Sequence, residues 1–203
     1  MNLAALLNQR TAYYDYDANE SVDRQTIEQL VTEAMKAPSA YHLQNWYFIA
    51  VTTPEHKNKL CQVAYEQRQI LSAAVTFIVC GDMDGYKRLP AALQPSIDMG
   101  TLPQILATSF IEGINNSHPN NPQLRRDEAI RSASLASMVL MLTAESKGFA
   151  TGPMSGFDIT ALQEAFDLPE YLLPVMLVTV GTTTVPRFPS KQRLPVVDKL
   201  TIL

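Results

Sequence analysis

Apolar side chains recur at helical spacing along much of the chain, and each such stretch predicts a helix with one buried face. Asp23 can cap the second of these stretches, and Thr53 followed by Pro54 can open the third. Pro38 stops the second because the residue before a proline is displaced from helical backbone angles. Gly148 ends the longest. The helices predicted from this spacing cover 3–8, 23–37, a stretch from Pro54 onward, 98–114, 124–147 and 158–166.

Aromatic and branched side chains without a helical period predict three buried strands, at 46–51, 75–80 and 174–181. The Asn- and Pro-rich stretch 115–122 reads as a surface loop. The tail 182–203 is punctuated by proline and shows no helical period. Helices and strands alternate irregularly, with no internal repeat, linker or shift in composition, so we expect one domain over residues 1–203.

Composition narrows the class of protein. The 203 residues are 46% hydrophobic and 18% charged, which suits a domain with a sizeable core. A net charge of −4 without a basic face argues against a nucleic-acid partner. We expect no signal peptide and no membrane span, because the start of the chain lacks a basic, apolar leader and no apolar run approaches about 20 residues. Cys61 and Cys80 lack CxxC partners; as buried free thiols they fit a reducing cytoplasm, and no metal site is predicted.

The chain contains neither GxGxxG nor GxxxxGK[ST], so a nucleotide-like cofactor would be held without these loops. Lys191 and Arg193 offer another way to hold a phosphate, because side chains two residues apart in an extended segment point the same way. The alternative is a solvated tail. A glycine-containing loop, 148–158, can bring its backbone close to a planar ligand, although such a loop is also a plain connection.

A polar loop joins the second predicted helix to the first predicted strand. Its string P-S-A-Y-H-L-Q-N-W, at 38–46, resembles the pattern A-P-S-[SA]-x-N-x-Q-[PN]-W of the nitroreductase family of FMN-dependent oxidoreductases, with His42 where the family usually has Asn. The stretch 148–157 resembles the family segment G-[LFY]-x-T-x-x-x-x-G-F, and 191–193 resembles its C-terminal K-x-R. The order and spacing of these matches, more than any one of them, carry the resemblance.

The resemblance implies a set of FMN-binding residues. K-x-R would bind the phosphate with Arg10, which begins the family string R-x-S-x-R; here Ala12 and Tyr14 depart from that string. The 38–42 loop would lie on the flavin, and 153–156 would face its ring with a backbone N–H near N5. Gln69, with Gln67 as second choice, would meet the pyrimidine edge. The implied set is Arg10, Thr11, Ala12, Tyr14, Pro38, Ser39, Ala40, His42, Gln67, Gln69, Pro153, Met154, Ser155, Gly156, Lys191 and Arg193.

The resemblance also implies an α+β fold, a mixed sheet wrapped by helices in an intertwined homodimer. The C-terminal tail would cross to the partner, where 200–203 would add an edge strand. One subunit would supply Arg10, Lys191 and Arg193, and the other the 38–42 loop. The implied activity is hydride transfer from NADH or NADPH to FMN and then to a nitroaromatic, quinone or similar electrophile. We assign no catalytic acid or base and no metal.

Two other functions stay open at this point. The departures at Ala12, Tyr14 and His42 motivate a flavin-binding carrier or sensor without turnover, which steady-state consumption of NAD(P)H would distinguish. A hydrolase could pair Ser39 or Ser155 with a histidine, His42 or His118. No GxSxG or SxxK context supports that reading.

Overall fold

The computed structural model describes residues 2–186 and 188–203, and within them four strands form one sheet. The strands lie in the order β1-β2-β4-β3, and each neighbouring pair is antiparallel. All eight residues of β2 are buried, because β2 lies between two strands and both faces of the sheet are covered. The strands are β1 (Trp46–Val51), β2 (Val75–Asp82), β3 (Ala150–Met154) and β4 (Leu172–Gly181).

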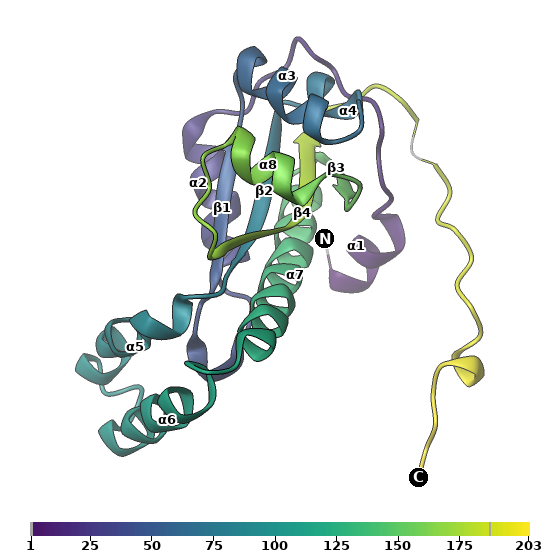
Figure 1. Ribbon diagram of the computed structural model, residues 1–203. Helices are drawn as coiled ribbons and strands as arrows, with labels where there is room; N and C mark the ends of the chain where they lie inside the picture. The colour runs from purple at the N-terminus through teal and green to yellow at the C-terminus, as the bar shows by residue number, and fades with distance from the viewer. Residues whose placement is uncertain (1, 187) are drawn as a thin grey trace.

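Helices cover both faces of the sheet (Figure 1). The α-helices are α1 (Leu3–Gln9), α2 (Arg24–Ala34), α3 (Pro54–Val63), α4 (Gln69–Ser72), α5 (Leu89–Asp98), α6 (Gln104–Ser117), α7 (Pro122–Ser146) and α8 (Ile159–Ala165). Three short 3-10 helices are η1 (Ala40–His42), η2 (Gly85–Arg88) and η3 (Val196–Asp198). Alternation along β2 divides the core: Phe77 and Val79 pack with α2 and α7, whereas Ile78 packs with α3 and α8.

The three N-caps predicted from the sequence are confirmed. The Asp23 carboxylate accepts from the backbone N–H of Thr26 at 2.6 Å, and the Thr53 hydroxyl accepts from that of His56 at 3.3 Å. Asp158 caps α8 in the same way. Gly148 follows the end of α7 with a φ of 89°, a left-handed angle that glycine adopts without steric cost. The three predicted strands are also present, with the second extended to Asp82 and α2 ending at Ala34 rather than at 37.

The predicted helix over 98–114 is confirmed from Gln104 onward, but its start is wrong. The chain forms α5 before it and α6 from Gln104, with a turn between them in which Gly100 has a φ of 70°. Pro103 is the N-cap of α6, because a proline ring fits the start of a helix but not its interior. The predicted loop 115–122 is also too long: α6 continues to Ser117 and α7 begins at Pro122.

The stretch 148–158, expected to be a loop, contains the strand β3. Its sequence A-T-G-P-M lacks an apolar alternation, and it holds a proline that cannot donate to a ladder. Proline is tolerated here because β3 is the last strand of the sheet order. Beyond it, Ala12 forms a parallel bridge to Thr151, so the segment after α1 lies along the outer side of β3.

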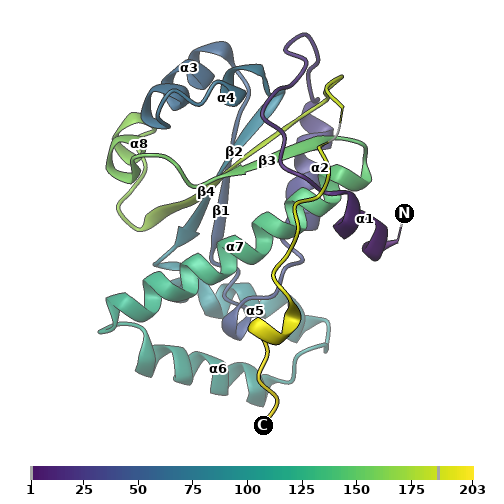
Figure 2. The same cartoon turned by 90° about the vertical axis from the view of Figure 1, so that its right-hand side faces the viewer.

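The described part of the tail stands apart from the sheet in Figure 1, and in Figure 2 it passes in front of α7. Residues 200–203 form no strand here, and their pairing with a partner subunit stays a prediction. The tail exposes the apolar side chains of Phe188, Leu194, Val196, Val197, Leu200, Ile202 and Leu203. Cys61 and Cys80 are buried free thiols, as predicted. Within the described residues, no helix combines the length and apolar character needed to cross a membrane.

Candidate functional site

A small basic cavity joins the two ends of the chain. The segment after α1 is fixed to β3, because the backbone N–H of Tyr13 donates to the carbonyl of Thr151 at 3.0 Å. The tail passes over this segment and encloses a cavity of about 150 Å³. The described residues that line it are Arg10, Thr11, Ala12, Tyr14, Phe188, Pro189, Ser190, Lys191 and Arg193. The structure therefore brings together the two sequence motifs expected to share one ligand.

The cavity is suited to an anion. Arg10, Lys191 and Arg193 bring three cations to it, and none of its described lining residues is acidic. Nη1 of Arg10 is buried and has no hydrogen-bond partner among the described residues. An unpaired buried donor of a charged group is costly, so the cavity is complete only with an acceptor in it. A phosphate group, with up to two negative charges and several acceptor oxygens, fits these residues.

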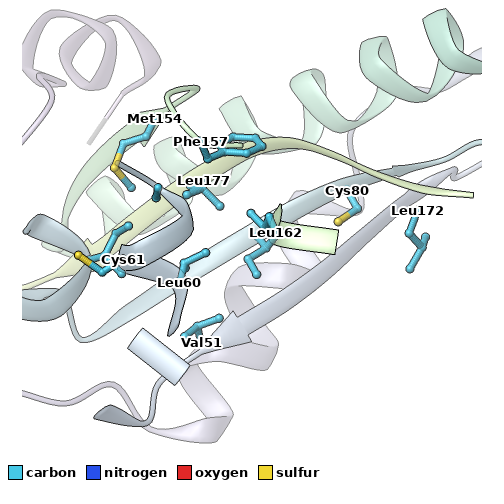
Figure 3. Close-up of a cluster of buried hydrophobic side chains, with 12 residues drawn as sticks. Val51, Leu60, Cys61, Cys80, Met154, Phe157, Leu162, Leu172 and Leu177 are labelled. Carbon is cyan, nitrogen blue, oxygen red and sulfur yellow. The ribbon is translucent and has the colours of Figure 1, made fainter. Parts of the chain in front are cut away.

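A second group of predicted residues meets at the other end of β3. Nε2 of Gln67 donates to the carbonyl of Gly156 at 2.6 Å. Nε2 of Gln69 lies 3.1 Å from Oε1 of Gln67 and 3.0 Å from Sδ of Met154. Met154 and Phe157 are anchored in the core cluster drawn in Figure 3. Gln67 is thus a brace for the 153–156 loop, and Gln69 is a buried amide behind it.

Both ends of this site depend on β3. Its first residues pair with the segment after α1, and its last residue leads into the loop that Gln67 holds. A strand rises about 3.3 Å per residue, so the two ends are separated by about 10 Å or more. A single ligand reaching both must be elongated, with an anionic end and a polar end.

The 38–42 loop lies away from the Arg10 cavity of its own chain, against α6. The ring of Tyr41 packs edge-to-face on Phe110 of α6, with centroids 5.6 Å apart. The Ser39 hydroxyl accepts from the backbone N–H of Gln44 at 2.9 Å, which folds the loop back on itself. Pro38, Ser39, Ala40 and His42 are not among the residues lining the Arg10 cavity. Within one chain, the loop and the cavity are therefore separate.

Sequence reasoning missed part of the site. Phe188, Pro189 and Ser190 line the cavity, and the only signal for them was their position just before K-x-R. The structure does not support the hydrolase alternative, because within the described residues no side-chain hydrogen bond joins Ser39 or Ser155 to a histidine. His118 instead pairs with Ser117, with Nδ1 and Oγ 2.8 Å apart.

Comparison with known proteins identifies this arrangement. The model of the nitroreductase family matches residues 7–182. The chain belongs to the nitroreductase family. That membership confirms the resemblance predicted from the motifs, and the solved relatives confirm the predicted α+β fold. The four described strands pair antiparallel, where a mixed sheet was expected, and the intertwined homodimer with strand exchange stays a prediction.

Several known proteins resemble this chain along most of its length. YodC of Bacillus subtilis, named as an NAD(P)H nitroreductase, is 32% identical over 194 residues, covering 96% of this chain and 95% of YodC. The CLA biosynthesis enone reductase of Lactiplantibacillus plantarum is 28% identical, and the match covers 89% of this chain and 85% of that enzyme. A nitroreductase structure from Exiguobacterium sibiricum, solved in complex with FMN, has a TM-score of 0.92 at 27% identity, covering 100% of this chain and 98% of that one.

Proposed function

We propose that this protein is an FMN-dependent oxidoreductase that uses NADH or NADPH to reduce nitroaromatic, quinone or similar electrophilic compounds. The observation that carries the proposal is the cavity in which Nη1 of Arg10 is buried without a partner, beside Lys191 and Arg193. FMN ends in a phosphate monoester, which supplies the acceptors that this cavity lacks. The FMN complex of the Exiguobacterium sibiricum relative supports the same cofactor.

In this proposal the chain binds and orients the cofactor. Arg10, Lys191 and Arg193 hold the phosphate, and Gln69 meets the pyrimidine edge. Gln67 fixes the loop that presents Ser155 and Gly156 to the ring, through its bond to the Gly156 carbonyl. When bound, FMN supplies the hydride chemistry, so we assign no side chain as catalytic acid or base. A backbone N–H of the 153–156 loop stabilises negative charge on the ring without a proton transfer.

We further propose that the site is completed in a homodimer by the 38–42 loop of the partner. Two observations support this. The loop does not line the Arg10 cavity of its own chain, and the tail exposes apolar side chains, such as Ile202 at 86% exposure, that association would cover. We propose one FMN-binding domain over residues 1–203, and Cys61 and Cys80, as buried free thiols, agree with a cytoplasmic location.

The identity of the flavin and its turnover test the function. We expect the purified protein to be yellow, to release FMN rather than FAD on denaturation, and to consume NADH or NADPH continuously with a quinone, a nitroaromatic or a conjugated enone. The enone belongs in the panel because one relative is an enone reductase. FMN binding without steady-state NAD(P)H consumption would favour the carrier or sensor alternative. Failure to bind FMN after reconstitution would reject both.

Arg193→Ala is expected to weaken FMN binding by about 10- to 100-fold, because a charge-assisted hydrogen bond contributes about 1.5–3 kcal/mol. Arg193 is exposed, and its Nη1 donates to the nearby Lys191 carbonyl at 2.7 Å, so folding should change little. Fluorescence titration of apoprotein with FMN measures the effect. Lys199→Ala is the control, since Lys199 is a tail cation outside the cavity lining. Equal losses in both variants would indicate general charge attraction instead of a phosphate site.

A further inference from the structure

The chain leaves the sheet after β2, forms α5 and α6, and returns at the start of α7. Figure 1 shows α5 and α6 projecting beyond one end of the sheet, away from α3, α4 and α8. We refer to residues 85–121 as the helical hairpin. The segment that leads into it and the segment that leads out of it meet at its base.

The base is held by charged and aromatic groups from both segments. The carboxylate of Asp84 lies 2.6 Å from Nζ of Lys87 and 3.1 Å from Nη1 of Arg125. The ring of Tyr86 lies 5.6 Å from the Arg125 guanidinium and 5.8 Å from the ring of His118. We call Asp84, Tyr86, His118 and Arg125 the hinge cluster, because they tie the first turn of the hairpin to its return.

The neighbours of His118 fix the tautomer of its neutral ring. The Ser117 hydroxyl donates its only hydrogen to the carbonyl of Gly113 at 2.7 Å. It must therefore accept from Nδ1 of His118, which lies 2.8 Å away. In the neutral ring, Nδ1 therefore carries the hydrogen and Nε2 carries the lone pair. Nε2 is buried and has no hydrogen-bond partner among the described residues, and His118 as a whole is 3% exposed.

Adding a proton to Nε2 would create a buried N–H and a charge with no acceptor. Burial lowers the pKa of His118; Glu128 opposes this, and Arg125 adds to it. The other charged groups at the base are Asp84, which already binds two cations, and Lys87, which lies 5.8 Å over the Tyr86 ring. Asp82, just before them, is paired with Arg88. Glu128 is in turn paired with Arg131 at 2.6 Å. No described group at the base is therefore free to accept a hydrogen bond from the new Nε2–H. The charged ring is accommodated when the base opens and water reaches it.

The hairpin carries the 38–42 loop with it. Leu43 belongs to the same buried cluster as Leu89, Leu93 and Ile114, and Ala40 packs against that cluster. The ring of Tyr41 packs edge-to-face on Phe110 of α6. Movement of the hairpin relative to the sheet must displace this loop or break these contacts.

We propose that the hinge cluster is a proton-sensitive hinge, in which protonation of His118 at Nε2 releases the hairpin and the 38–42 loop from the sheet. His118 is a positioning residue and touches no ligand. The hinge itself is independent of the proposed function. Only its consequence rests on that function: release of the loop would loosen FMN and widen access to it.

The direction of the pH effect follows from linkage. The closed state binds the proton more weakly than the open state, where His118 has its ordinary pKa near 6.5. Closure is therefore strongest above that pH and weakens as pH falls. One proton makes the opening equilibrium rise about tenfold per pH unit, between 6.5 and the lower pKa of the closed state.

Hydrogen exchange measured by mass spectrometry on the purified protein tests the hinge. After correction for chemical exchange, peptides from 89–117 and 38–45 should lose protection about 3- to 10-fold between about pH 7.5 and about pH 5.5, relative to peptides from β2. His118→Gln should remove this difference. His56→Gln should retain it, because His56 is an exposed histidine on α3, bonded at Nδ1 to the Thr53 hydroxyl at 2.7 Å.

Several outcomes would overturn the proposal. These are equal protection at the two pH values, a pH effect that persists in His118→Gln, or one that disappears in His42→Asn instead. If His118→Gln does not fold, an NMR titration of the wild-type imidazoles tests the proposal instead. His118 should then become protonated at a pH below its ordinary pKa, and the hairpin should open over the same pH range. A protein that binds no FMN but passes these tests would reject the proposed function and keep the hinge. FMN release that is unaffected by pH, with a hinge that opens, would reject only the link between them.

Discussion

Removal of residues 182–203 is expected to abolish FMN binding and homodimer formation together. The tail supplies Lys191 and Arg193 to the Arg10 cavity, and without it Arg10 faces solvent with no enclosing wall. The same tail carries the exposed apolar side chains that we expect a partner to cover. In an obligate dimer, folding and association are inseparable, so the shortened chain is expected to aggregate or to unfold readily.

Analytical ultracentrifugation and flavin absorbance measure the two losses. A full-length variant with Lys191→Gln and Arg193→Gln is the matched control, because it removes the cavity charges and keeps every apolar side chain of the tail. We expect this control to remain a dimer and to lose FMN. A shortened protein that stays a soluble yellow dimer would contradict both roles of the tail. A control that becomes monomeric would show that the two cations act in association and not in cofactor binding.

The elements that could be predicted are those whose signals are local. Asp23, Thr53 and Asp158 lie next to the N–H groups they cap, and the β2 strand is apolar along its whole length. The α5–α6 turn has a weak local signal, because an apolar period continues across it. What breaks the helix is Gly100, with its left-handed φ of 70°, and Pro103, which has no N–H to donate. The strand β3 lacks a local signal for a different reason. Its residues are suited to the backbone segment after α1, which lies along the strand only once the chain has folded.

The site shows the same division. The K-x-R spacing predicted that Lys191 and Arg193 share one ligand, and the structure places both at one cavity with Arg10. Nothing in the sequence indicated that the segment after α1 is held along β3, since the parallel bridge between Ala12 and Thr151 has no local pattern. The brace from Gln67 to Gly156 spans 89 residues and is likewise a product of the fold. The hinge cluster required both ends of the helical hairpin to be placed before its chemistry could be recognised.

Gly152→Ala is expected to destabilise the protein by about 2 kcal/mol or more, because overpacking a filled site costs about 1–3 kcal/mol and this site has little freedom to relax. A methyl carbon at residue 152 would lie 2.5 Å from the Tyr13 carbonyl oxygen and 2.6 Å from Oγ1 of Thr179. It would also lie 2.8 Å from the Tyr16 hydroxyl, which is itself bonded to Thr179 at 2.8 Å. The first of these is backbone and the other two are joined, so none can move alone.

The effect should extend to the cofactor, because the segment that must shift away from β3 is the one carrying Arg10. We therefore expect lower thermal stability together with weaker FMN binding, measured by calorimetry of apoprotein and by titration. Gly113→Ala is the matched control: it lies within α6, and its added methyl would be 3.5 Å from the Tyr41 ring, an ordinary contact. Replacing a helical glycine by alanine contributes about 0.5–1 kcal/mol of stability, so this variant should be neutral or more stable. If Gly152→Ala matched Gly113→Ala in both measurements, the segment after α1 would not lie against β3 as closely as the structure shows. The position of Arg10 would then have to be reconsidered.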